Sequence, residues 1–73
     1  MPKYYSVIVN DYPGGMKCRR GETREEIRKP GDVHQRIGDF RRDVLWFDTE
    51  AKADKYMQQK EKDIRRRRKG LNI

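Results

Sequence analysis

The sequence predicts an α+β protein in which a small antiparallel sheet of three or four strands packs on one C-terminal helix. Two segments, Lys3–Asp11 and Phe40–Asp48, are rich in the β-branched and aromatic residues that favour strands. From Thr49 onward the apolar residues recur at helical spacing instead. A chain of 73 residues has room for one domain. We therefore expect a single domain over residues 1–69, with a basic helix end, followed by a disordered C-terminal tail over residues 70–73.

The first predicted strand has two different faces, because successive side chains of a strand point to opposite sides. Tyr5, Val7 and Val9 share the more apolar face and should enter the core. Tyr4 and Ile8 lie on the other face, where they remain accessible.

A tight turn and a second strand should follow. The Pro-Gly-Gly sequence at 13–15 favours a turn, because proline presets φ and glycine accepts positive φ. The chain then returns as the second strand of a hairpin, with Met16 and Cys18 on one face and Lys17 and Arg19 on the other.

Residues 21–37 allow two interpretations. Thr23–Glu26 fits a capping box and would begin a short helix that ends at Pro30-Gly31. The same residues also fit an edge strand, because Lys29–Asp32 suits a type II turn that leads into Val33–Ile37. We favour the second interpretation, in which these two segments form a hairpin.

The strand at Phe40–Asp48 is apolar on both faces over Val44–Phe47. One face should meet the helix, and the other must be covered by a loop, a second chain or a partner. Thr49 is a good N-cap for the helix that follows, and Ala53 is small enough for close approach to the sheet. Gly70 should end this helix.

Positive charge is concentrated near the C-terminus. The net charge is +7, and residues 58–73 carry seven Lys or Arg against two Asp or Glu, an excess of five. Such a concentration attracts polyanions, namely nucleic acid, acidic protein surfaces or anionic lipid. The alternative is a solvated helix end whose cations suit the negative end of the helix dipole.

Catalysis is not expected. The single His34 and the single Cys18 form no metal-ligand or disulfide pattern, and the chain contains no phosphate-binding glycine loop. We therefore predict no enzyme activity, no cofactor and no metal site. The sequence shows no signal peptide and no apolar run long enough to span a bilayer, so we expect a soluble, cytoplasmic monomer.

Two kinds of binding remain as hypotheses. In the first, an exposed apolar face receives a segment of a partner protein, and the candidate residues are Tyr4, Ile8, Leu45 and Phe47. In the second, cations neutralise the phosphates of nucleic acid or meet an acidic surface. The candidates for this contact are Arg41, Arg42, Arg65, Arg66, Arg67, Arg68 and Lys69.

Two resemblances bear on this choice. A small sheet followed by a helix, with F-x-T-x-x-x-A at the junction (Phe47, Thr49 and Ala53), is similar to the arm-type DNA-binding domains of phage integrases, which place a sheet in a groove. This resemblance implies a small basic DNA-binding module.

The chain opens MPKYYSVIVNDYPGG and ends KEKDIRRRRKGLNI. In size, basicity and layout it resembles small phage-encoded regulators of host RNA polymerase, which inhibit transcription and act in antitermination. This resemblance implies binding to the large catalytic subunits of the bacterial polymerase, with initiation inhibited by loss of the σ factor and termination suppressed. No motif aligns individual binding residues.

Overall fold

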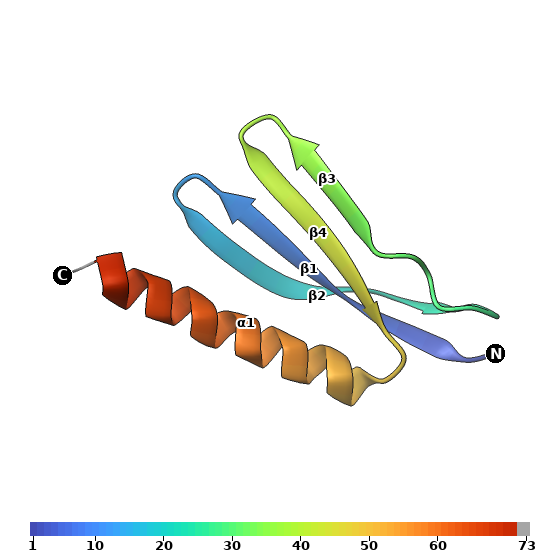
Figure 1. Cartoon of the computed structure of the whole chain (residues 1–73). Coiled ribbons are helices and arrows are strands. Elements are labelled where there is room, and N and C mark those ends of the chain that lie inside the picture. Colours follow the sequence, from blue (N-terminus) through green and yellow to red (C-terminus); the bar gives the residue numbers. More distant parts are fainter. Residues whose placement is uncertain (72–73) are drawn as a thin grey trace.

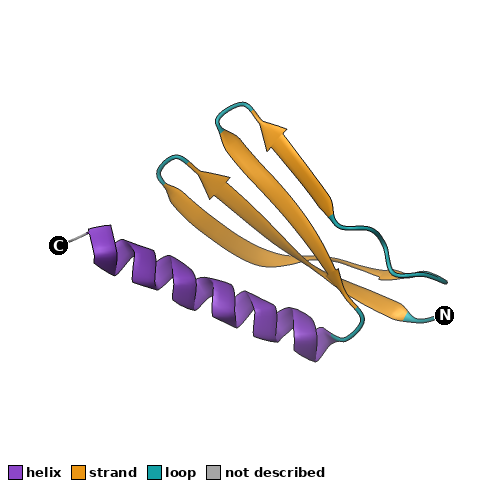
Figure 2. Ribbon diagram, viewed as in Figure 1, coloured by secondary structure: helices purple, strands orange, loops and turns teal. Residues whose placement is uncertain are grey.

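A computed structural model describes the backbone of residues 1–71 and the side chains of residues 1–66. The described chain contains strands β1 (Lys3–Tyr12), β2 (Gly15–Glu25), β3 (Val33–Ile37) and β4 (Phe40–Phe47), then helix α1 (Glu50–Leu71) (Figure 1). The strands form one antiparallel sheet in the order β2-β1-β4-β3, and α1 lies against one face of it (Figure 2). The predicted α+β fold is confirmed.

The sheet therefore has a helix face, covered by α1, and an open face on the other side. Val7, Val9 and Ala53 are almost completely buried between the sheet and α1. Met16, Cys18, Phe47, Tyr56 and Met57 pack around them, together with Tyr5. The prediction that Tyr5, Val7 and Val9 share the core face is confirmed, and the small side chain of Ala53 marks the closest approach of helix and sheet.

The start of α1 is held by polar contacts. The hydroxyl of Thr49 accepts a hydrogen bond from the backbone N–H of Lys52 at 3.2 Å, so Thr49 is the predicted N-cap. Arg20 of β2 forms an ion pair with the carboxylate of Asp54 and lies over the ring of Tyr5. These contacts join β2 to the first half of the helix. Gly70 lies inside α1 rather than at its end, and residues 72–73 of the predicted tail lie outside the described residues.

Both interpretations of residues 21–37 are wrong in part. The segment forms no helix, since β2 continues to Glu25 as an edge strand. The favoured hairpin is also wrong, because β3 pairs with β4 and not with β2. Gly38 has a φ of 58° and opens a two-residue turn between Ile37 and Phe40. A glycine at the first position of such a turn suits the twist of the two strands it joins. The pairing of β3 with β4 across this short turn is therefore favoured over a pairing of β3 with β2 across the longer connection from Glu25.

A β-bulge in β2, where Gly21 and Glu22 lie opposite Ser6 of β1, lets these two strands pack closely. The register shifts between Tyr5 and Val7, and the hydroxyl of Ser6 donates a hydrogen bond to the carbonyl of Glu22 at 2.8 Å. A Cβ added to Gly21 would lie 2.5 Å from the Ser6 Oγ and 3.0 Å from the Ile8 Cγ1. Glycine is required here because of the space, not because of its φ.

Within the described residues, no helix combines the length and the apolar character that crossing a membrane requires.

We expect Gly21→Ala to lower the free energy of unfolding by about 1–3 kcal/mol, because the new methyl group must displace the hydrogen-bonded Ser6. Gly14→Ala is the matched control, since a Cβ at Gly14 meets no atom within 4 Å. Urea unfolding of both variants checks the prediction. Equal stability of the two variants would contradict the close packing at the bulge.

Candidate functional site

Helix α1 leaves a large part of the sheet uncovered. It packs mainly on β2 and β1 and reaches the end of β4, whereas all five residues of β3 are exposed. In Figure 1 the helix runs back along the sheet, so that its basic end lies at the same end of the molecule as the two hairpin turns. Candidate binding surfaces are therefore the open face of the sheet and the region of β3 and β4 that lies beyond the helix.

A hollow of about 660 Å³ opens where β4 extends past the start of β3. The pairing of these strands ends at Val33 and Val44, so the last residues of β4 have no neighbouring strand on that side. Side chains from both faces of the sheet surround this free edge. We call the site the β4-edge hollow; it is lined by Tyr4, Lys29, Asp32, Leu45, Trp46, Phe47, Asp48, Lys52 and Tyr56.

The β4-edge hollow brings together three of the four predicted partner-binding residues. Tyr4, Leu45 and Phe47 line it, and each of them is half-buried. Ile8 does not line it but lies on the open face, near Gly21. Phe47 also packs against Tyr56 of α1, with ring centroids 5.4 Å apart, so its side chain serves the core as well as the hollow.

The free edge of β4 is capped by a side chain. The carboxylate of Asp32 accepts a hydrogen bond from the backbone N–H of Trp46 at 2.9 Å. An unpaired strand N–H is a template for pairing with another chain, and a carboxylate placed on it blocks that pairing. At the β4-edge hollow, the backbone N–H of Trp46 is therefore already hydrogen-bonded within the chain.

Charged groups form the rim of the hollow around an apolar floor. Lys52 bonds to Asp48 at 3.0 Å, and this hydrogen bond holds the pKa of Asp48 below its usual value. Burial, and the charge of Asp43 second, raises the pKa of Tyr56, which therefore stays a neutral phenol beside Phe47 in the apolar floor of the hollow. An apolar floor with a mixed charged rim suits an amphipathic segment of a protein.

The second apolar face of β4 is covered within the chain. Trp46 is 6 % exposed although it points to the open face, away from α1. The guanidinium of Arg24 lies over the Trp46 ring at 5.4 Å from the centroid. Pro30 and Gly31 border a second hollow, on the open face, which Trp46 also lines. Of the coverings considered from the sequence, the loop is the one observed.

The predicted cationic residues do not form one surface. Arg41 points to the helix face and contacts Asp43 at 3.2 Å. Its neighbour Arg42 points to the open face and donates a hydrogen bond to the side-chain oxygen of Asn10 at 3.1 Å. Arg65 and Arg66 are exposed on α1. The side chains of Arg67, Arg68 and Lys69 lie outside the described residues.

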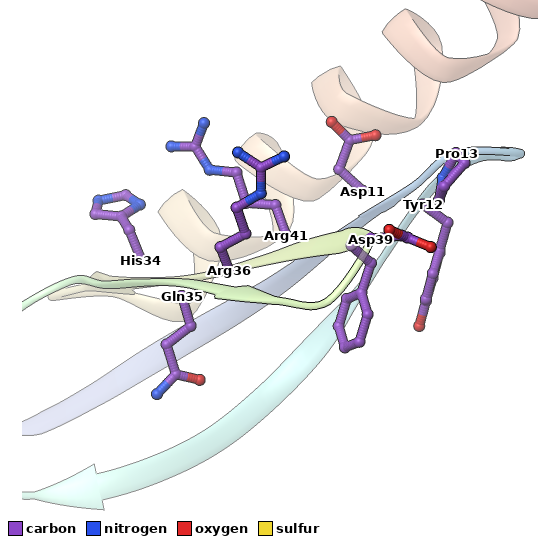
Figure 3. Close-up of a pocket in the computed structure, with 9 residues that line it drawn as sticks. Asp11, Tyr12, Pro13, His34, Gln35, Arg36, Asp39 and Arg41 are labelled. Atoms are coloured by element: carbon purple, nitrogen blue, oxygen red, sulfur yellow. The ribbon is translucent and has the colours of Figure 1, made fainter.

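A charged cluster lies at the tip of the β3–β4 hairpin. Figure 3 shows His34, Arg36, Arg41 and Asp11 on one side of the strands, with Tyr12 and Gln35 on the other. The Nδ1 of His34 lies 2.7 Å from a carboxylate oxygen of Asp43. Partial burial alone would raise the pKa of Asp43, but the hydrogen bonds and charges of His34 and Arg41 outweigh it and lower this pKa.

Groups able to do chemistry are sparse among the described residues. Within that part of the chain, no cluster of three or more His, Cys, Asp or Glu side chains is placed to hold a metal ion. The thiol of Cys18 faces the backbone carbonyl of Met57 at 3.8 Å. Burial, reinforced by Glu61, raises the pKa of Cys18, so its thiol is a poor nucleophile near neutral pH.

Several contacts near these surfaces depend on the sheet register and were not predicted from the sequence. Tyr12 and Phe40 stack with their centroids 5.1 Å apart, although they are far apart in the sequence. The sequence places Asp32 in a turn and gives no role to its carboxylate, which bonds to the Trp46 N–H. The position of Asp32 just before a short strand is the one signal that could have indicated an edge cap.

No protein-family model, curated protein or solved structure matches this chain. The fold and the site define a small α+β protein with an open sheet face and a hollow at a free strand edge.

Asp43→Asn should lower the free energy of unfolding at pH 7 by up to about 1 kcal/mol, since its partners are exposed. The folded state lowers the pKa of Asp43, so its stabilising effect is present above the unfolded value of about 3.9 and is lost as the pH falls through the folded value. Thermal unfolding at intervals from pH 5 to pH 2 should show the two proteins converging as the pH falls.

Asp39→Asn, at an exposed turn residue, is the control and should change stability little at any of these pH values. A difference between Asp43→Asn and the unchanged protein that stays the same size from pH 5 to pH 2 would contradict the assignment to this carboxylate.

Proposed function

We infer that this protein is a non-enzymatic transcription regulator that binds bacterial RNA polymerase. The observation that carries the binding role is the β4-edge hollow, in which Leu45, Phe47 and Tyr56 form an apolar floor beside a free strand edge. Such a site fits a short amphipathic segment of a partner protein better than a small substrate, since it is open and lies at the edge of the sheet.

The polymerase as partner is supported by the resemblance in size, basicity and layout to small phage-encoded regulators of that enzyme. In this proposal the chain acts as a monomer in the cytoplasm of the bacterial host, on the large subunits of the polymerase. It inhibits initiation by displacing σ and suppresses termination. The net charge of +7, with Arg65 and Arg66 exposed on α1, adds attraction to acidic surfaces of the enzyme.

Capture of purified bacterial RNA polymerase by the immobilised, nuclease-treated protein tests this function. Leu45→Lys should abolish retention of the large subunits, because it places a charge in the apolar floor of the β4-edge hollow. Ile27→Lys is the matched control, since Ile27 is 79 % exposed and does not line the hollow.

Circular dichroism of both variants checks that the fold is kept. Promoter-directed transcription with σ-containing polymerase should be inhibited by the unchanged protein and by Ile27→Lys, and not by Leu45→Lys. Absence of the large subunits from the retained fraction would remove the proposal.

A small DNA-binding module is the second proposed function, and the cations on the open face and on α1 favour it. Lys17, Arg19, Arg65 and Arg66 are all exposed. If these residues contact duplex phosphates, affinity for a 20-base-pair duplex should fall steeply with salt, by about 0.9 in log–log slope for each contact. A flat salt response in a fluorescence anisotropy titration would count against this second function.

A further inference from the structure

We propose that the open face of the sheet binds single-stranded nucleic acid, with a base stacking on the exposed ring of Tyr12, which packs on Phe40, and phosphates meeting Lys17 and Arg42. This activity is independent of the β4-edge hollow, since none of these four residues lines it.

The first observation is a row of polar side chains that runs across all four strands. The register pairs Lys17 with Asn10, Asn10 with Arg42, and Arg42 with Gln35. Paired residues of antiparallel strands point to the same face, so these four side chains stand next to one another. The row offers cations for phosphates and the exposed amide of Gln35 for base edges, whereas Asn10 is buried and holds Arg42 in place.

The second observation is an aromatic row directly beside the polar row, at the hairpin tips. Tyr12 and Phe40 stack at 5.1 Å between centroids, and Tyr12 is 39 % exposed. The guanidinium of Arg42 lies 5.7 Å from the centroid of the Phe40 ring. Aromatic rings next to cations are the arrangement on which unpaired bases stack while their phosphates are neutralised.

The third observation is an aliphatic row on the other side of the polar row. Arg19 pairs with Ile8, Ile8 with Val44, and Val44 with Val33. Val33 is 42 % exposed, and this row borders a hollow of about 400 Å³ beneath Pro30 and Gly31. Adjacent rows on one face lie about 6.6 Å apart. A nucleic-acid strand that lies across the polar row therefore meets apolar surface on both sides of that row.

The charges of the open face distinguish it from the helix face. The three rows, all within the described residues, contain Lys17, Arg19 and Arg42 and no carboxylate. On the helix face of β3 and β4, by contrast, Arg41 is bonded to Asp43, and Asp11 lies nearby. Glu22 also borders the hollow of about 400 Å³ but is paired with Arg24 at 2.8 Å. Lys17 and Arg19 therefore stay available for a polyanion, and Arg42 stands beside them while it donates one hydrogen bond to Asn10.

The exposed aromatic row favours single-stranded nucleic acid over an acidic peptide or a duplex. The Asp and Glu side chains of an acidic peptide would use the cations but carry no flat ring to stack on Tyr12. A duplex keeps its bases stacked on each other, whereas unpaired bases are free to stack on protein rings.

The test measures binding of fluorescein-labelled U12 RNA, dT12 DNA and a 12-base-pair duplex to the full chain by anisotropy, from 50 to 300 mM salt. Lys17→Gln/Arg42→Gln should lower the magnitude of the log–log salt slope for the single strands by about 1.4, that is about 0.7 for each phosphate that is no longer neutralised. Arg36→Gln/Arg41→Gln, which removes the same charge from the helix face, should leave that slope almost unchanged.

Tyr12→Leu should weaken single-strand binding about fivefold or more without changing the salt slope, because it removes a stacking surface and no charge. Since Arg42 is half-buried, Lys17→Gln alone and Tyr12→Leu serve as exposed variants that leave the core intact. The ratio of the U12 and dT12 affinities tells whether RNA or DNA is preferred.

Three results would overturn the proposal. They are an equal reduction of slope in the open-face and helix-face double variants, no effect of Tyr12→Leu, and duplex binding as tight as single-strand binding. Competition with poly-glutamate gives a further check. If poly-glutamate displaces U12 as effectively as unlabelled U12 does at equal charge, the contact is electrostatic only and the stacking site is refuted.

Discussion

The structure depends on one packing contact, in which Ala53 of α1 lies directly on Val7 and Val9 of β1. Because the side chain of Ala53 is so small, the helix axis comes close to the sheet, and Arg20 can bond to Asp54 across the junction. A single helix cannot cover both faces of a sheet, nor its whole width. The contact therefore protects β1 and β2 and leaves the other face and the β3–β4 side to solvent, to the connection between β2 and β3, or to a partner.

Because one helix covers only one face of the sheet, a small number of apolar residues is enough to form the core. The sheet places its best apolar residues on the helix face, and the open face is stabilised by smaller local contacts. Arg24 covers the ring of Trp46, and Asp32 accepts a hydrogen bond from the Trp46 N–H. Tyr12 and Arg42 cover the ring of Phe40. Each of these covers is a polar or amphipathic group, so the open face keeps hydrogen-bonding capacity that a second helix would have removed.

The elements that depend on local sequence were predictable, and those that depend on long-range pairing were not. Alternation in Lys3–Asp11 identified Tyr5, Val7 and Val9 as core, and the Thr49 cap located the start of α1. The predicted partner of β3 was wrong, because the turn signal at Lys29–Asp32 resembled that of a hairpin while the decisive one lay at Gly38. Only part of the β4-edge hollow could be predicted from the sequence. Leu45 and Phe47 were apparent as surplus apolar residues, but the nearness of Tyr4 follows only from the β1–β4 register.

The strand order also determines how the chain must fold. Within β1–β2 and β3–β4 the strands are joined by short turns, whereas the central β1–β4 pair joins Tyr5 to Phe47, at nearly opposite ends of the sheet-forming segment. Pairing over such a separation carries a loop-closure cost that the two hairpins do not. The hairpins are thus suited to form early and independently, and their docking along β1 and β4 creates the surface on which α1 packs. During synthesis on the ribosome that docking must wait until β4 has emerged, so the β1–β2 hairpin has neither its neighbouring strand nor its helix when it first forms.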